Sequence, residues 1–202
     1  MPNSLSTLRV QRWDDHRLYH HSRVNQTLHL ISALSFLVSY AYLVINPAIS
    51  ALIAWCVAMT TRQIGHFVFE PRNYDERNHM SFEEKEDVKL GYNLQRKTVL
   101  LTIWVGLPVA LWIDPTALGY LREPMDFAGY AINVGWTWFW LGLAGAVFRT
   151  VQLFVSHNLE TGLVWLLKII TDPFHDIKIY WKAPFYLLKG EWVDPNHGAH
   201  PF

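Results

Sequence analysis

The sequence has one cysteine, Cys56, among its 202 residues. A single thiol excludes an intramolecular disulfide and a zinc cluster built on thiolates. An excess of one charge is also lacking, because 17 lysines and arginines balance 17 aspartates and glutamates and form no basic run. We therefore expect no nucleic-acid partner. The N-terminal residues lack the short apolar region and small-residue cleavage site of a secretory signal peptide, so no cleaved leader is predicted.

Long apolar runs, by contrast, are plentiful. Hydrophobic residues make up 51% of the chain. They cluster in runs that approach the ~20 residues a helix needs to cross the hydrocarbon core of a bilayer. This pattern predicts an all-α integral membrane protein, a single membrane-embedded helical domain over residues 1–202 with about four transmembrane helices. The predicted spans are residues 30–46, 49–69, 98–113 and 130–155.

Two segments outside these runs predict amphipathic or polar helices. Residues 160–190 mix aromatic residues with lysines around two prolines, a composition typical of interfacial helices that lie on a membrane. Residues 81–95 are polar and charged. There Ser81 is followed three positions later by Glu84, which is the pattern of a capping box and predicts the start of a helix.

Lysine and arginine residues collect on one side of the predicted spans. They precede the first span, lie between the second and third, and follow the fourth, whereas the other two connections contain only Arg122. Cytoplasmic loops of membrane proteins carry such an excess of basic residues. We therefore expect a multi-pass protein of a bacterial inner membrane or the endoplasmic reticulum, with both termini on the cytoplasmic side.

The ten histidines lie near the ends of the apolar runs, and none falls in residues 98–133. His21, Asn25 and His29 are spaced four positions apart, so on a helix they share one face. His66 and Glu70 repeat this spacing at the end of the second span. The predicted topology thus gathers the histidine site on the cytoplasmic side.

The first two spans meet at a turn that contains Pro47. This proline lies 18 residues after His29 and 19 residues before His66. At about 1.5 Å per helical residue, both histidines lie about 27 Å from the turn. A helical hairpin therefore brings the two imidazoles side by side at nearly equal depth.

Imidazole and carboxylate groups on convergent helices are ligands that suit iron, manganese or zinc. A site rich in histidine, with few carboxylates and no thiolate, favours iron or zinc over magnesium or calcium. On a helix His20 points about 100° away from His21, so the two can serve different purposes. His157 ends the fourth span and lies on the same side of the membrane. The predicted metal ligands are therefore His20, His21, His29, His66 and His157.

Two segments carry a resemblance to a known family. The first is Tyr19-His20-His21 with Asn25 and His29, and the second is Gln63-Ile64-Gly65-His66-Phe67-Val68-Phe69-Glu70 with Arg72. They resemble the signature segments of the Mpo-type 2-hydroxy fatty acid dioxygenases, small membrane proteins formerly described as a domain of unknown function. The resemblance implies an iron(II)-dependent enzyme of fatty acid alpha-oxidation, which uses molecular oxygen to shorten a 2-hydroxy acyl chain by one carbon. It also implies that the essential imidazoles are His20 or His21, His29 and His66.

The chain departs from the family pattern at two places. A single hairpin separates the two segments, and Asn73-Tyr74-Asp75 stands where a Pro-Ala pair usually follows the glutamate segment. The chain from Lys97 onward has no counterpart that aligns with the family.

Within this resemblance the polar residues near the imidazoles have predicted roles. Glu70 is a predicted catalytic residue, as a metal ligand, as a partner that orients His66, or as a base for the substrate hydroxyl. Asn25 is predicted to donate a hydrogen bond to substrate or to oxygen. The predicted cofactor is Fe(II), and the predicted partners are a lipid or fatty acid substrate, molecular oxygen and the membrane. The substrate carboxylate is predicted to pair with Arg23, Arg62 or Arg72.

Two alternatives remain open from the sequence. One is a membrane lipid hydroxylase or desaturase with two iron atoms. Its ligands would come from His16, His20, His21, His29, His66, His157 and His175. The other is a non-catalytic or haem-binding membrane subunit in which His29 and His66 are axial ligands.

Overall fold

The computed structural model describes residues 4–70, 72–76, 78–88 and 94–195. Within these residues the regular elements are helices, and β-pairing is limited to two isolated bridges. The helices are α1 (Ser4–Tyr19), α2 (Arg23–Ile45), α3 (Pro47–Ile53), η1 (Ala54–Met59), α4 (Thr60–Val68), α5 (Phe82–Val88), α6 (Leu94–Ile113), α7 (Phe127–Ser156), α8 (Leu159–Tyr180) and α9 (Ala183–Leu188). The predicted all-α class is confirmed.

Three of these helical rods are long and apolar enough to cross a membrane. They are Arg23–Ile45, Pro47–Val68 and Phe127–Ser156. The second rod comprises α3, η1 and α4 in direct succession, and η1 is a π-helical turn within it. The third run predicted from the sequence forms a shorter apolar helix, Thr98–Ile113, inside α6. These lengths fit a membrane protein.

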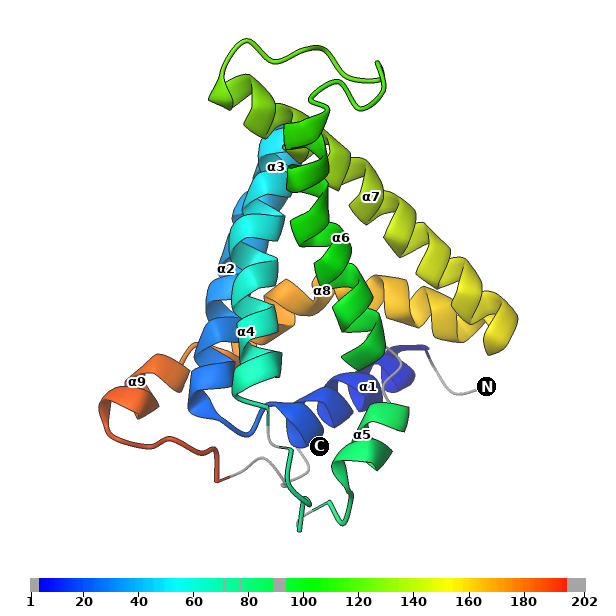
Figure 1. Ribbon diagram of the computed structural model, residues 1–202. Coiled ribbons are helices and arrows are strands. Elements are labelled where there is room, and N and C mark those ends of the chain that lie inside the picture. The colour runs from blue at the N-terminus through cyan, green and yellow to red at the C-terminus, as the bar shows by residue number, and fades with distance from the viewer. Residues whose placement is uncertain (1–3, 71, 77, 89–93, 196–202) are drawn as a thin grey trace.

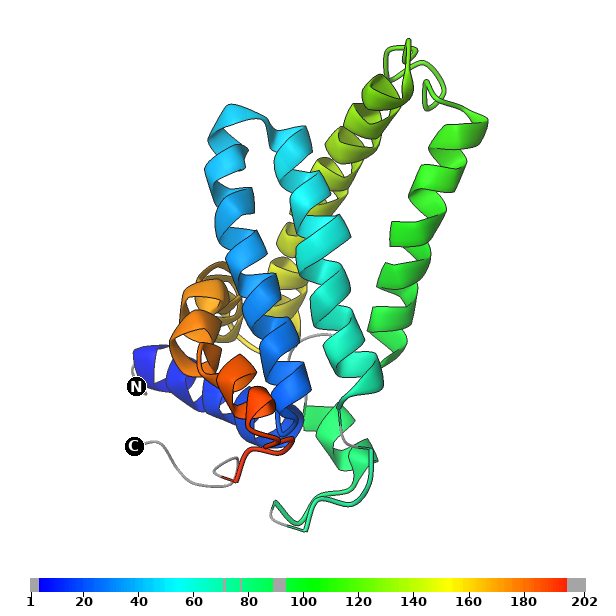
Figure 2. The ribbon, with the colours of Figure 1, turned by 90° about the vertical axis from the view of Figure 1, so that its left-hand side faces the viewer.

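The long helices stand together, and the remaining helices gather near one end of them. Figure 1 shows α2 beside the α3–α4 rod, with α6 and α7 next to them. The helices α1 and α8 run across the lower part of this group, and Figure 2 shows them with α9 at that same end. Among the packed pairs are α3 with α7, α2 with α8, and α1 with α8. The two crossing helices therefore enclose the end of the hairpin at which the histidines lie.

Local chemistry fixes the turn between α2 and α3. The Asn46 side chain accepts a hydrogen bond from the backbone N–H of Ala48 at 3.1 Å, and Pro47 occupies the first turn of α3, where its missing N–H costs nothing. Further down the hairpin, the hydroxyl groups of Ser39 and Ser50 lie 2.9 Å apart and join the two rods. The hairpin is thus held at its tip and along its length.

The apolar core lies between the long helices. Ala51, Leu111, Val134 and Trp138 are buried in one cluster. Large apolar side chains elsewhere on the rods, such as Val44 at 91% exposure, point away from the protein. A helix surface of this kind suits hydrocarbon surroundings.

The capping box predicted at the start of the polar helix is confirmed. The Glu84 carboxylate accepts a hydrogen bond from the Ser81 backbone N–H at 2.7 Å, and Ser81 Oγ accepts one from the Glu84 N–H at 3.2 Å. The resulting helix, α5, ends at Val88, and the predicted continuation through residues 89–93 lies outside the described residues. The predicted segment 160–190 forms α8 and α9, and Pro173 lies inside α8.

Candidate metal centre

Three imidazoles converge at the lower end of the hairpin. His20 follows α1, His29 belongs to α2 and His66 to α4. Each offers one ring nitrogen, and the three nitrogen atoms lie within 4.8 Å of one another. Nε2 of His20 is 3.1 Å from Nε2 of His29, and the ring centroids of His29 and His66 are 4.9 Å apart. The prediction that His29 and His66 meet side by side is confirmed, and the three residues form a group that could hold a metal ion.

The short connection between α1 and α2 places His20. Ser22 caps α2 by accepting a hydrogen bond from the Asn25 backbone N–H at 3.5 Å. The side-chain amide of Asn25 donates to the Tyr19 carbonyl at 2.9 Å, and that of Gln26 donates to the His20 carbonyl at 2.9 Å. Asn25 and Gln26 are both fully buried. They fix the backbone of this connection, so that the His20 ring is held against His29.

Gly65 permits α4 to approach α2 at the level of the imidazoles. A β-carbon at this position would overlap Oδ1 of Asn25 and would lie 3.5 Å from Cδ2 of His29. Only glycine leaves room for this contact. The glycine that precedes His66 thus sets the distance between the two helices that supply His29 and His66.

Two carboxylates lie behind the imidazoles. Glu70, one helical turn after His66, places Oε2 at 2.7 Å from Nδ1 of His66. Asp176 of α8 places Oδ2 at 3.6 Å from Nδ1 of His29. A carboxylate at Nδ1 leaves Nε2 as the ligand atom, which is the usual support for a metal-bound histidine. The sequence reasoning missed Asp176, although two aspartates spaced four apart in an apolar helix are a signal that could have found it.

The surroundings favour neutral imidazole. His20 and His29 are 6% and 1% exposed. Burial, together with the neighbouring His29 and His66, lowers the pKa of His20 well below its usual value. A neutral imidazole keeps the lone pair that binds a metal. The ring of Tyr180, which is 2% exposed, packs against His20 and His29 and covers this side of the group.

The structure does not bring His21 or His157 into this group. Nε2 of His21 contacts the Arg17 carbonyl and lies 3.7 Å from Oδ2 of Asp75. His157 ends α7, is exposed, and has its Nδ1 2.9 Å from Oγ of Ser156. The sequence had left His20 and His21 both as candidates, and the turn between α1 and α2 selects His20.

The arginines predicted to bind a substrate carboxylate have partners within the protein. Arg23 is buried, and its Nη1 lies 2.9 Å from Oδ2 of Asp194, while its guanidinium stacks over Tyr186. Arg62 pairs with Asp176 through Nη2. Arg72 is exposed and donates to the Phe67 carbonyl at 3.0 Å. Asn25, predicted to donate to substrate or oxygen, uses its amide nitrogen on the Tyr19 carbonyl instead.

A second charged network joins α1 to α8 next to the imidazoles. Asp172 accepts a hydrogen bond from Arg12 Nε at 3.1 Å and pairs with Lys168 Nζ at 2.9 Å. Lys168 also contacts the carboxylate of Asp15. His16, a candidate ligand in the two-iron alternative, has its Nδ1 3.1 Å from the Tyr180 hydroxyl. These contacts hold the crossing helices over the end of the hairpin.

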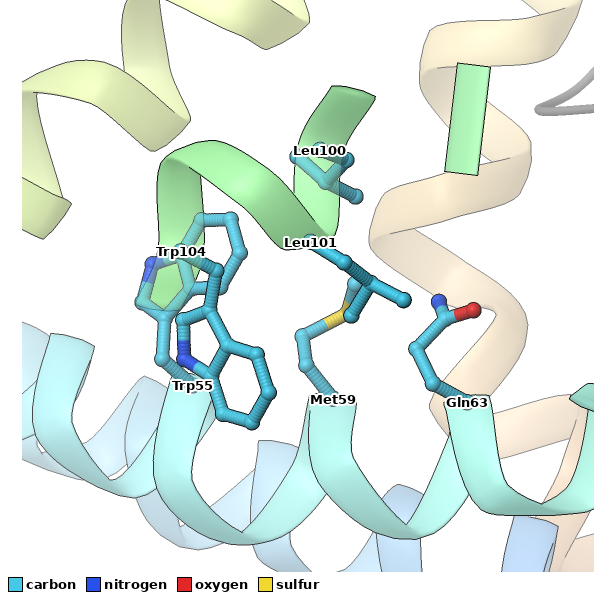
Figure 3. A pocket seen from close by; sticks show the side chains of 6 residues that line it. All are labelled: Trp55, Met59, Gln63, Leu100, Leu101 and Trp104. Atoms are coloured by element: carbon cyan, nitrogen blue, oxygen red, sulfur yellow. The ribbon is translucent and has the colours of Figure 1, made fainter. Parts of the chain in front are cut away.

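An apolar recess lies between the second rod and α6. Figure 3 shows its lining residues, with three side chains from each side. They are Trp55, Met59, Gln63, Leu100, Leu101 and Trp104. Two of them, Trp55 and Met59, belong to the π-turn η1, and Gln63 lies on α4 three positions before His66. Turns of this type are frequent at functional sites. The recess is therefore on the same rod as one ligand of the candidate metal centre.

No protein-family model, curated protein or solved structure matches the chain.

Proposed function

We propose that this chain is a membrane-embedded oxygenase that uses one non-haem iron(II) ion, held by His20, His29 and His66, to act on a fatty acid or related lipid. The observation that carries the proposal is the convergence of these three imidazoles, whose ligand nitrogens lie within 4.8 Å of one another. Sites of neutral nitrogen donors without thiolate suit iron, and three protein ligands leave coordination positions open. When bound, iron(II) supplies the one-electron chemistry that a reaction with molecular oxygen needs.

The protein residues hold and shield this site. Glu70 orients His66 by accepting a hydrogen bond from the N–H at its Nδ1, because Oε2 and Nδ1 are 2.7 Å apart. Tyr180 and the crossing helix α8 exclude water on the side of His29, whose exposure is 1%. The His66 side chain is 14% exposed, so a substrate approaches from its side. The site is thus closed at His29 and accessible at His66.

A lipid substrate agrees with the surroundings of His66. Its acyl chain would lie along the apolar side chains between the second rod and α6 (Figure 3). Arg62 lies one turn before His66, and among the described residues its Nε has no hydrogen-bond partner. Arg62, whose side chain is 22% exposed and pairs with Asp176, is the cation that we assign to the substrate carboxylate. The 2-hydroxy fatty acid of the resembled family has both features, an acyl chain and a carboxylate next to the reacting carbon.

The membrane arrangement that goes with this proposal has four spans. The apolar part of α6 supplies the fourth, and α1 and α8 lie in the cytoplasmic interface. Support comes from α8, which runs across the long helices in Figure 1 and leaves apolar residues such as Leu163, Ile170 and Phe174 exposed. A helix with such a face lies in the headgroup region. Both termini and the imidazoles are then on the cytoplasmic side.

We propose one iron rather than two because the other candidate histidines lie outside the three-imidazole group. The remaining ligands of a two-iron site would be His16, His21, His157 and His175, and none of these is in the three-imidazole group. A haem between His29 and His66 is also disfavoured, because His20 lies against both rings, at 4.1 Å and 5.3 Å between centroids. There is no space for a macrocycle between them.

The test is metal content and turnover of the purified full-length protein. We expect about one iron per chain in anaerobically purified protein, no Soret band, and oxygen-dependent shortening of a 2-hydroxy fatty acid by one carbon. The variant His66→Ala should lose both iron and turnover, whereas His157→Ala should keep both, since His157 is exposed and outside the group. Two irons per chain, a Soret band, or full activity of His66→Ala would contradict the proposal.

A further inference from the structure

The carboxylate of Asp176 stands at the junction between α8 and the hairpin. Asp176 is 6% exposed. Its Oδ2 accepts a hydrogen bond from Arg62 Nη2 and lies 3.6 Å from Nδ1 of His29. On the opposite side of the same ring, Nε2 of His29 lies 3.1 Å from Nε2 of His20. The imidazole of His29 is therefore placed between a carboxylate and the centre of the three-imidazole group.

We propose that Asp176 is the positioning residue of His29, an inference that rests on the metal site proposed above. A carboxylate next to Nδ1 keeps the proton on that nitrogen and leaves the lone pair of Nε2 directed at the metal. It also fixes the rotation of the ring. Glu70 contacts His66 more closely, through a hydrogen bond of 2.7 Å at Nδ1, whereas Asp176 faces Nδ1 of His29 at 3.6 Å, beyond hydrogen-bond length. Two of the three imidazoles thus have a buried carboxylate beside them, one from Glu70, just after α4, and one from α8.

Arg62 keeps the Asp176 carboxylate in place. It lies on α4 four positions before His66, so the helix that supplies one ligand also holds the partner of another. The guanidinium of Arg62 and the imidazole of His29 both meet Oδ2 of Asp176. The pair therefore joins α4, α8 and α2 at the site.

Asp172 provides a matched control. It lies one helical turn before Asp176 on α8 and is also 6% exposed. Its partners are Arg12 at 3.1 Å and Lys168 at 2.9 Å, and neither belongs to the three-imidazole group. Replacing either aspartate by asparagine removes one buried charge from the same helix. Only the change at Asp176 removes a carboxylate that faces a ligand.

The experiment measures metal affinity rather than activity. Full-length protein in detergent is stripped of metal and titrated with Zn²⁺ against a chromophoric chelator, and Co²⁺ is added separately to record its visible absorption. We expect Asp176→Asn to bind Zn²⁺ about 10–100-fold more weakly, which is the usual effect of removing such a partner. Its Co²⁺ spectrum should change, because the spectrum reports the geometry of the ligands. Asp172→Asn should keep the wild-type affinity and spectrum, even if its thermal stability falls.

A second variant separates positioning from folding. Asp176→Asn leaves Arg62, whose side chain is 22% exposed, without its charged partner, and this is destabilising. The double variant Arg62→Met/Asp176→Asn removes both charges and should show the same loss of Zn²⁺ affinity while remaining folded. Asp176→Glu, which keeps the carboxylate, should recover part of the affinity.

Each failure has its own meaning. If wild-type protein binds Zn²⁺ and Co²⁺ and Asp176→Asn binds them equally well, the positioning role is refuted and the metal site stands. An equal loss in Asp172→Asn refutes it as well, because the effect is then a general one of charge removal from α8. Wild-type protein that binds neither metal refutes the metal site and the role of Asp176 together.

Discussion

Replacing Gly65 by alanine is expected to destabilise the protein and to weaken metal binding, although alanine is the better helix former. Gly65 lies within α4, where this exchange would by itself favour the helix by about 1 kcal/mol. A β-carbon there would overlap Oδ1 of Asn25. Because Asn25 is fully buried and its amide holds the Tyr19 carbonyl at 2.9 Å, it cannot move without losing that bond.

The magnitude follows from these two costs. Forcing an extra carbon into a packed contact costs about 1–3 kcal/mol. A buried hydrogen bond lost from Asn25 costs about 1–3 kcal/mol. After the helix propensity is deducted, the free energy of unfolding should fall by about 1–5 kcal/mol. The displaced backbone carries His20, so Zn²⁺ affinity should fall with it.

The assay is thermal unfolding in detergent together with Zn²⁺ titration, and Gly145→Ala is the matched control. Gly145 lies inside α7, and apart from its chain neighbours and the nearby backbone of α7 no atom is within 4 Å of the position that its β-carbon would take. Gly145→Ala should therefore leave the free energy of unfolding unchanged or raise it by up to about 1 kcal/mol. The double variant Asn25→Ala/Gly65→Ala should be less destabilised than the sum of the single changes. A Gly65→Ala protein as stable as Gly145→Ala, with unchanged Zn²⁺ affinity, would refute the close-approach argument.

Two further predictions concern the buried pair that ties α5 to the segment before it. Lys85 is 1% exposed and its Nζ lies 2.8 Å from Oδ2 of Asp75, so Lys85→Met should lower the unfolding free energy by about 3–5 kcal/mol. Chemical denaturation checks this, and a loss below 1 kcal/mol would show that the pair is not buried in solution. Burial alone would raise the pKa of Asp75, but hydrogen bonds from Lys85 and Asn78 outweigh it and hold that pKa below its usual value. A depressed pKa means stability that is present above the unfolded-state pKa of about 3.9 and is lost as pH falls through the folded-state value. The free energy of unfolding should therefore fall less on acidification in Asp75→Asn than in the wild-type protein. An equal fall below pH 5 in both proteins would contradict this.

The hairpin and the meeting of two histidines were predictable because both depend on regular spacing along helices. The near-equal distances of His29 and His66 from Pro47 placed the two imidazoles at one depth, and their ring centroids are 4.9 Å apart. The capping box at Ser81 was predictable for the same reason, since it involves residues three positions apart. Helical periodicity is a local property, so the sequence expresses it directly.

The choice between His20 and His21 was not local. On a continued helix the series His21, Asn25 and His29 would share a face, but α1 ends at Tyr19 and α2 begins at Arg23. The break turns His21 toward Asp75 and His20 toward His29. Buried hydrogen bonds from the amides of Asn25 and Gln26 to the intervening backbone determine this geometry. The carbonyls that these amides bind lie in the non-helical connection between α1 and α2, and the spacing of residues along a helix does not describe such a connection.

By itself, the sequence determined the helical class, the apolar rods and the depth at which two imidazoles meet, because these follow from composition and from the rise per residue of a helix. Only the tertiary structure decided which third histidine joins His29 and His66 and that Asp176 lies beside His29. Asp176 lies 147 positions after His29 along the chain, and the pair forms only when α8 packs across α2. Contacts between helices that are far apart in the sequence depend on packing, and the spacing of residues within one helix does not predict them.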